Sequence, residues 1–145
     1  MFKMVVKLGK YSNGKPMHYS VGALIERDGK YLLIDRVKVP LGFAGIAGHI
    51  DEGETPEDAL LREVFEEIQT KVLDYKLIRE ETLLKNRCSR GIDIHHWYLY
   101  KVEIKGEPKI DLSEAKSMNW YALKEMKTLT FEPAWDYWFK KLKII

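Results

Sequence analysis

Cysteine and long apolar runs are what this sequence most lacks. Cys88 is the only cysteine among 145 residues, which excludes a disulfide within the chain and fits a reducing compartment. No segment approaches the roughly 18 consecutive apolar residues that a membrane-spanning helix needs. Residues 1–8 are interrupted by lysines and lack the apolar centre of a secretory signal. We therefore expect a cytoplasmic protein without a membrane segment, in which Cys88 has no functional role.

A strong charge of one sign is also absent. The 24 Lys and Arg residues nearly balance the 22 Asp and Glu residues, and the formal net charge is +2. This charge is too small to indicate a nucleic-acid partner or a membrane surface. The sequence has no internal repeat or low-complexity linker, and its 46% hydrophobic residues suffice for one core. We expect a single domain over residues 1–145, as a monomer or a homodimer.

The sequence does contain a well-marked helix start. Thr55 is a residue type that caps helices, and Pro56 suits the first helical position. Glu57 and Asp58 follow, where acids interact favourably with the positive end of the helix dipole. The hydrophobic spacing then predicts a helix over residues 56–68.

The predicted helix concentrates acids on one arc. At 3.6 residues per turn, its apolar residues gather on one side: Leu60, Leu61, Val64, Phe65 and Ile68. Glu63, Glu66 and Glu67 lie together on a different arc, where like charges at helical spacing repel. Arg62 is the only cation among them, so the remaining negative charge favours a hard divalent cation with oxygen ligands, Mg²⁺ or Mn²⁺. A solvated acidic face is the simpler alternative.

These residues carry a family resemblance. The segment resembles the Nudix box, G-x5-E-x7-R-E-U-x-E-E-x-G-U, in which U is a bulky aliphatic residue. The positions that match are Gly48, Glu54, Arg62, Glu63, Val64, Glu66 and Glu67. Gln69 and Thr70 depart from the pattern, and Gln69 stands where glycine usually ends the helix in a left-handed conformation. The helix either keeps that conformation at a cost of about 1 kcal/mol or runs on through Val72.

The resemblance implies both a fold and a chemistry. It implies an α/β fold, the Nudix α/β/α sandwich with a mixed sheet, and a hydrolase that cleaves a diphosphate joining a nucleoside to another group. The implied ligands of Mg²⁺ (or Mn²⁺) are Glu63, Glu66 and Glu67. One of them, or Glu114, would accept the proton of the attacking water.

Supporting roles are implied for the residues around these acids. Arg62 would orient a catalytic glutamate, and Glu54 would support the helix and the loop before it. The backbone carbonyl of Ala47, just before the box glycine Gly48, would add a metal ligand. Glu114, which precedes the strand that Trp120 opens, would be a further ligand or help to activate water.

The remaining elements follow from strand and turn signals. Strands are predicted over residues 19–26 and 30–37, joined by a hairpin at residues 27–29. Further strands are predicted over residues 77–84, 92–104 and 119–123, with a cationic loop over residues 85–91. A terminal helix over residues 131–145 has Pro133 in its first turn. His95 and His96 point to opposite faces of a regular strand, so we do not expect them to bind a metal jointly.

The substrate is less well determined by the sequence. Candidate phosphate-binding cations are Arg36, Lys38, Lys85, Arg87 and Arg90. Candidate base-stacking aromatics, most of which are equally suited to the core, are Trp97, Tyr98, Trp120, Trp135, Tyr137 and Trp138. Motifs that mark other Nudix substrates are missing, which leaves a small-molecule nucleotide, in particular a nucleoside triphosphate or its oxidised form.

Two other classes of function remain open. One is a nucleotide-binding module that does not cleave its ligand, although such a module has little need for mutually repelling acids. The other is an isomerase-type relative of the same fold, which is expected to use a catalytic cysteine and differently spaced acids. Cys88 alone is weak support for the second class.

Overall fold

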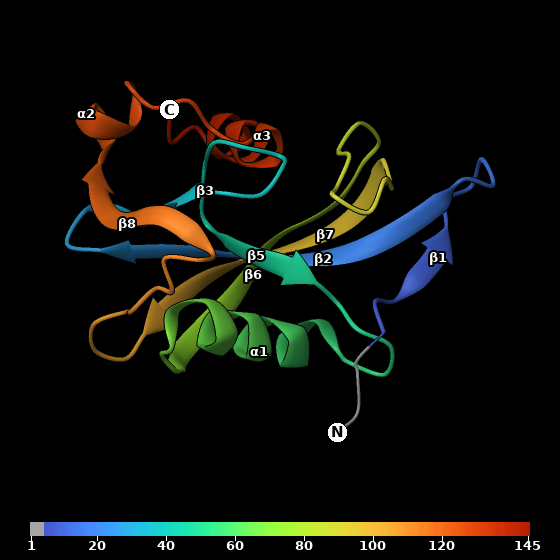
Figure 1. The fold of residues 1–145 in the computed structure, drawn as a ribbon, viewed down its shortest axis with the longest axis horizontal. Coiled ribbons are helices and arrows are strands. Elements are labelled where there is room, and N and C mark those ends of the chain that lie inside the picture. Colours follow the sequence, from blue (N-terminus) through green and yellow to red (C-terminus); the bar gives the residue numbers. More distant parts are fainter. Residues whose placement is uncertain (1–4) are drawn as a thin grey trace.

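The computed structural model describes residues 5–145, which form an eight-stranded sheet and three helices (Figure 1). The strands are β1 (Leu8–Lys10), β2 (Pro16–Arg27), β3 (Lys30–Arg36), β4 (Phe43–Ala44), β5 (Ile46–His49), β6 (Val72–Leu83), β7 (Ile94–Ile104) and β8 (Ala115–Ala122). The helices are α1 (Pro56–Ile68), α2 (Leu123–Met126) and α3 (Pro133–Lys141). Residues 1–4, the start of the segment in which we expect no secretory signal, lie outside the described range.

The sheet is organised around β2. Along one edge β2 pairs in parallel with β7, and β7 pairs antiparallel with β6. The other edge of β2 is shared by β1, β5 and β3, all antiparallel. Because β3 pairs with β2 only near the hairpin, β5 occupies the middle of that edge. The carboxyl end of β5 therefore lies across β2 from the start of β7.

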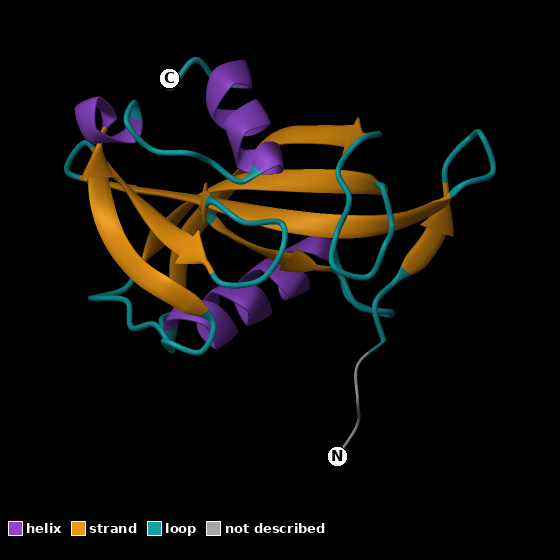
Figure 2. Cartoon of the chain, turned by 45° about the horizontal axis from the view of Figure 1, so that its top comes forward, coloured by secondary structure: helices purple, strands orange, loops and turns teal. Residues whose placement is uncertain are grey.

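Helices cover both faces of the sheet. Figure 2 shows α1 on one side and α3 on the other, which confirms the expected α/β fold with a mixed sheet. Helix α3 buries Trp135, Trp138 and Phe139, which are among the largest fully buried side chains. Across residues 5–145, no helix is both long enough and apolar enough to cross a bilayer.

The orientation of α1 corrects the predicted apolar side. Leu61 and Phe65 are 42% and 58% exposed, whereas Leu60, Val64 and Ile68 are buried as expected. The reason is that Glu63 and Glu67 occupy part of the inward arc, adjacent to Leu60 and Val64 on the helical wheel. The apolar pattern alone predicts that Leu61 and Phe65 point inward, but Glu63 and Glu67 occupy that arc instead.

Several element bounds differ from those predicted. The hairpin between β2 and β3 is confirmed, with Asp28 and Gly29 both at positive φ, as the favoured two-residue turn requires. β6 begins at Val72 rather than Leu77, because its mostly exposed first half is held by backbone pairing with β7. β8 likewise begins earlier than predicted, and α3 covers only the middle of residues 131–145. β1, β4 and β5 are too short for a recognisable hydrophobic pattern.

Candidate functional site

Helix α1 is closed at both ends by side-chain or backbone caps. The Thr55 hydroxyl accepts a hydrogen bond from the Asp58 N–H at 3.1 Å, and the Asp58 carboxylate accepts one from the Thr55 N–H. At the other end Gln69 adopts the left-handed conformation, with φ 54° and ψ 37°, and its N–H donates to the Phe65 carbonyl. Of the two predicted outcomes the first holds, so the helix does not run on through Val72. The bounds of the helix fix where the acids face.

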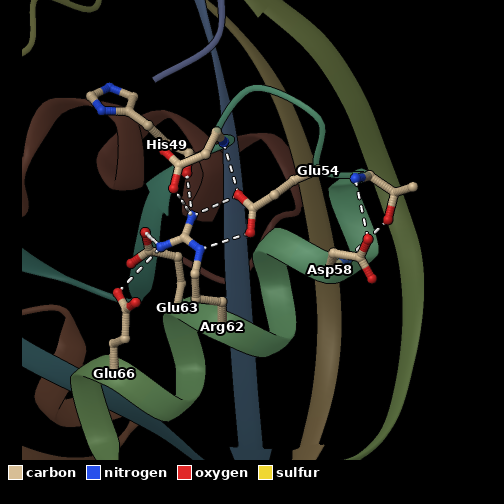
Figure 3. A network of polar contacts seen from close by, with 8 residues as sticks. His49, Glu54, Asp58, Arg62, Glu63 and Glu66 are labelled. Carbon is tan, nitrogen blue, oxygen red and sulfur yellow. Dashed lines mark hydrogen bonds and ion pairs between the residues drawn. The ribbon is translucent and has the colours of Figure 1, made fainter. Parts of the chain in front are cut away.

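Arg62 connects α1 to the loop before it (Figure 3). Its guanidinium donates two hydrogen bonds to the Glu54 carboxylate, at 2.8 and 2.9 Å, and one to the His49 carbonyl at 2.9 Å. It also donates to Glu63 at 2.8 Å and to Glu66 at 3.2 Å. This network holds the Glu63 carboxylate and connects the end of β5 to the helix.

Asp51 belongs to the same network and was not predicted from the sequence. Its carboxylate lies 3.4 Å from the Arg62 Nη2, and its N–H donates to Glu54 at 2.8 Å. Asp51 is outside the residues that define the Nudix box. The only sequence signal is an acid three residues before Glu54, and that spacing is too common to identify a site.

Gly48 lies directly against the Glu63 side chain. A Cβ atom built on Gly48 would overlap the Glu63 carboxylate group. A glycine here lets the acid pack directly against the backbone of β5, and a larger residue would displace the Glu63 side chain. Ala47 and Gly48 line the same cavity as Glu63, so the backbone of this strand and the helix acids enclose one space.

The acids differ in their protonation behaviour. Hydrogen bonding to Arg62 lowers the pKa of Glu54. Burial raises the pKa of Glu63 to about 7, although Arg62 opposes the shift. Burial, together with the neighbouring Glu63 charge, raises the pKa of Glu67 to about 8. Glu63 and Glu67 are mostly buried carboxyls with less cationic compensation than Glu54 has, and their oxygens are the donor type that Mg²⁺ and Mn²⁺ prefer.

The acids open into a cavity of about 540 Å³. Glu66 and Glu67 line it together with Glu63, and Glu114 lines it as well. The Glu114 carboxylate is half-exposed and lies 3.4 Å from the Lys38 Nζ. All the acids that the sequence predicted as metal ligands therefore line a single cavity.

The predicted substrate contacts divide into two groups. Cations that line the cavity are Arg36, Lys38, Arg87 and Arg90, whereas Lys85 does not. Among the aromatics, Trp97 and Trp135 line the cavity, each with most of its side chain in the core. The other aromatic candidates lie elsewhere, and Trp138 is fully buried in the core.

Three imidazoles form a group that was not predicted: His49 and His95 line the cavity, and His18 packs against both. Burial is the main cause of the lowered pKa in each: to about 3 for His49, to about 4 for His95, and in the same direction for His18. His96 points away, as predicted from alternation, and pairs with Glu80 at 2.9 Å. The prediction could not find the group because its members come from three separate strands.

Comparison with known proteins gives a consistent set of matches. A family model for the NUDIX domain matches residues 16–142. A MutT NUDIX hydrolase from Burkholderia pseudomallei has a similar structure, with TM-score 0.64, 26% identity, and coverage of 75% of this chain and 85% of that one. The ORF135 protein of E. coli gives TM-score 0.57 and 28% identity over 81% of each chain. No curated protein gives a significant match.

A MutT protein from Bacillus halodurans gives a higher TM-score, 0.70, over 85% of this chain and 80% of that one. Its sequence identity of 17% supports the fold alone.

Proposed function

The chain belongs to the NUDIX domain family and is a Nudix hydrolase, and we propose that it uses Mg²⁺ or Mn²⁺ to cleave a diphosphate bond of a nucleotide. The observation that carries this proposal is the pair of mostly buried carboxyls, Glu63 and Glu67, at the wall of the cavity. Burial raises the pKa of each, and the neighbouring arginines only partly oppose the shift. A divalent cation is the natural partner for such a pair.

The chain's own residues have distinct roles in this proposal. Glu63, Glu66 and Glu67, with the Ala47 carbonyl, would hold the cation. When bound, the cation would neutralise charge on the phosphate oxygens and make the attacking water more acidic. Arg62 holds Glu63 in place, and Glu54 holds Arg62, so these two residues act by positioning.

Hydrolysis requires a carboxylate that accepts a proton. A water oxygen forms a new bond to phosphorus, the bridging P–O bond breaks, and the diphosphate oxygen leaves with the electron pair. The proton of the water passes to Glu63, Glu67 or Glu114, which all line the cavity. Glu63 and Glu67 would also be ligands of the cation, whereas Glu114 lines the same cavity beside Lys38.

A nucleotide suits the remaining walls of the cavity. Arg36, Lys38, Arg87 and Arg90 line it and would bind phosphate oxygens. Its volume of about 540 Å³ is within the range of small-molecule sites. A nucleoside triphosphate, including an oxidised one, is the proposed substrate because motifs for other Nudix substrates are missing.

A substrate panel tests the proposal. The protein is incubated with Mg²⁺ and nucleoside triphosphates, oxidised triphosphates, nucleotide sugars, ADP-ribose or dinucleoside polyphosphates, and the products are separated by ion-exchange chromatography. We expect hydrolysis that EDTA abolishes and added Mg²⁺ restores. Ligand binding without turnover would instead favour a binding module, and turnover that persists in EDTA would contradict the proposed metal role.

Amide variants test the ligand assignment. Glu66→Gln and Glu67→Gln each remove a charge without changing shape, so the turnover number should fall by about 100-fold or more. Glu103→Gln is the matched control, because Glu103 is an exposed acid on β7 that does not line the cavity. Unchanged turnover in both helix variants would remove Glu66 and Glu67 from the site.

A further inference from the structure

A second group of metal-binding side chains lies beside the acids. It consists of His18, His49, His95 and Cys88, whose potential ligand atoms all lie within 4.8 Å of one another. The Nε2 atoms of His49 and His95 are 3.3 Å apart, and the Cys88 sulfur lies 3.8 Å from the His18 Nδ1. The proposed hydrolysis uses none of these four side chains.

Sheet register explains why the three histidines converge. His18 on β2 pairs with His95 on β7, and directly paired residues project from the same face. His49 on β5 pairs with Ser20, which faces the same way as His18 because it is two residues along β2. The three rings are accordingly close, with centroids 4.7 to 5.6 Å apart. Their positions are fixed by the backbone pairing of three strands.

Cys88 comes from the loop between β6 and β7. This loop is folded back on itself, since the Asn86 N–H donates to the Asp93 carbonyl at 2.7 Å and the Cys88 N–H donates to the Ile92 carbonyl at 3.0 Å. A cysteine thus meets three histidines from the sheet, although it is the only cysteine in the chain.

The geometry is close to that of a tetrahedral metal site. With zinc–nitrogen bonds of about 2.05 Å and a zinc–sulfur bond of about 2.3 Å, adjacent ligands are separated by about 3.3 Å (N to N) and about 3.6 Å (N to S). The two separations quoted above match these values within about 0.3 Å. The remaining separations are at most 4.8 Å, so binding would draw these atoms together by no more than about 1.5 Å.

Burial of the imidazoles favours a bound metal cation, because their ring nitrogens otherwise have few partners. His18 and His95 are only 5% and 2% exposed, so their ring nitrogens are held largely out of water. The His95 Nδ1 has no hydrogen-bond partner in residues 5–145, although the backbone at Asp93 and Asn86 is near enough to oppose the fall in its pKa. Two imidazole nitrogens that face each other can share one proton at most, whereas a cation accepts both lone pairs.

We propose that His18, His49, His95 and Cys88 bind a zinc ion that fastens the loop over residues 84–93 to the sheet. Three imidazoles and a thiolate suit Zn²⁺, whereas Mg²⁺ prefers the carboxylates of α1, so the two sites select different metals. Four protein ligands complete the coordination, which is typical of a structural zinc site. Arg87 and Arg90 flank Cys88 and line the cavity, so the zinc ion would hold these cations beside the substrate.

Cobalt substitution is the direct test. Untagged, reduced protein is saturated with Mg²⁺ to occupy the acids, titrated with Co²⁺, and followed by absorption spectroscopy. We expect a thiolate-to-cobalt charge-transfer band in the near ultraviolet together with the strong visible bands of tetrahedral Co²⁺, both lost on adding Zn²⁺. Because Cys88 is the only cysteine, Cys88→Ser must abolish the charge-transfer band.

Two further variants separate this site from the acids. His96→Asn, the fourth histidine and a neighbour of His95, should leave the band unchanged, and so should Glu67→Gln. Elemental analysis of the wild-type protein after zinc loading and gel filtration should give close to one zinc per chain, and less than a tenth of that in Cys88→Ser. A folded wild-type protein with neither the band nor bound zinc would overturn the proposal, and the four residues would then form a metal-free hydrogen-bonded group.

Discussion

Arg62 separates the acids around it into two groups. Glu54 and Asp51 form ion pairs with the guanidinium and have mainly a positioning role, whereas no ion pair joins it to Glu67. The exposed Glu66 pairs with the guanidinium at 3.2 Å. Glu63 is intermediate between these groups. It accepts one hydrogen bond from Arg62, yet its pKa remains raised. The arginine therefore organises the site without neutralising it, and this leaves negative charge for a cation.

A lysine cannot replace Arg62 in this arrangement. Arg62→Lys keeps the positive charge but loses the planar fork that contacts Glu54, Glu63 and the His49 carbonyl together. We expect turnover to fall by about 10- to 100-fold because Glu63 is displaced, while the circular dichroism spectrum stays unchanged. Arg79→Lys, at an exposed position on β6, is the control. Full activity in Arg62→Lys would show that charge alone suffices.

The contact between Gly48 and Glu63 gives a second residue-level prediction. Gly48→Ala places a methyl group where the Glu63 carboxylate lies, so the acid must move away from β5. We expect turnover to fall by at least about 10-fold while the thermal midpoint changes little, because only the end of one side chain is displaced. Steady-state kinetics and thermal unfolding measure the two effects. Wild-type turnover in this variant would contradict the close packing.

Burial of Glu67 also predicts a pH-dependent effect on stability. Its folded pKa is raised from 4.5 to about 8, so ionisation destabilises the metal-free folded state progressively as the pH rises between these values. In EDTA, Glu67→Gln should exceed the wild type in stability at pH 8, by about 1 kcal/mol after solvent screening, and the difference should shrink towards pH 5. Urea unfolding at several pH values measures this difference. A difference that grows as the pH falls would have the wrong sign.

At the level of secondary structure, helix α1 shows most clearly how local sequence and tertiary contacts together set the ends of an element. Its sequence specifies the start, which Thr55 and Pro56 mark, but leaves the end open because Gln69 occupies the usual glycine position. The helix ends at Ile68 although Gln69 is strained there, which indicates that tertiary contacts determine the end. Thr70, the second departure from the box, is buried and its hydroxyl donates to the Lys105 carbonyl, which anchors the chain just beyond the helix.

The left-handed Gln69 makes the end of α1 a place to gain stability. Gln69→Gly removes the steric cost of positive φ and should stabilise the protein by about 0.5–1 kcal/mol. Gln69→Ala is the matched control and should give no gain, because alanine keeps a Cβ. Chemical unfolding at neutral pH compares the variants. A glycine variant no more stable than the alanine variant would show that Gln69 carries no strain.

For the molecule as a whole, local signals in the sequence were sufficient for the fold class and for most of the acid site. The box predicted Glu54, Arg62, Glu63, Glu66 and Glu67 because their spacing lies within one loop and one helix. Glu114 was predicted through the resemblance, and its place in the same cavity depends on long-range packing.

Other features were beyond local patterns. Leu61 and Phe65 point outward because Glu63 and Glu67 point inward. A helical wheel based on hydrophobicity alone cannot predict that the acids, and not the apolar residues, face the protein. Asp51 joins Arg62 only because the loop folds over the helix. His18, His49 and His95 come together through the register of three strands, which no spacing in the sequence specifies.

Anomalous diffraction from crystals soaked in Mn²⁺ tests the central claim most directly. The account predicts a manganese peak bounded by the Glu63, Glu66 and Glu67 carboxylates and the Ala47 carbonyl, and no such peak in crystals of Glu67→Gln soaked in the same way. Well-ordered wild-type crystals that show no anomalous peak among these groups would contradict the account.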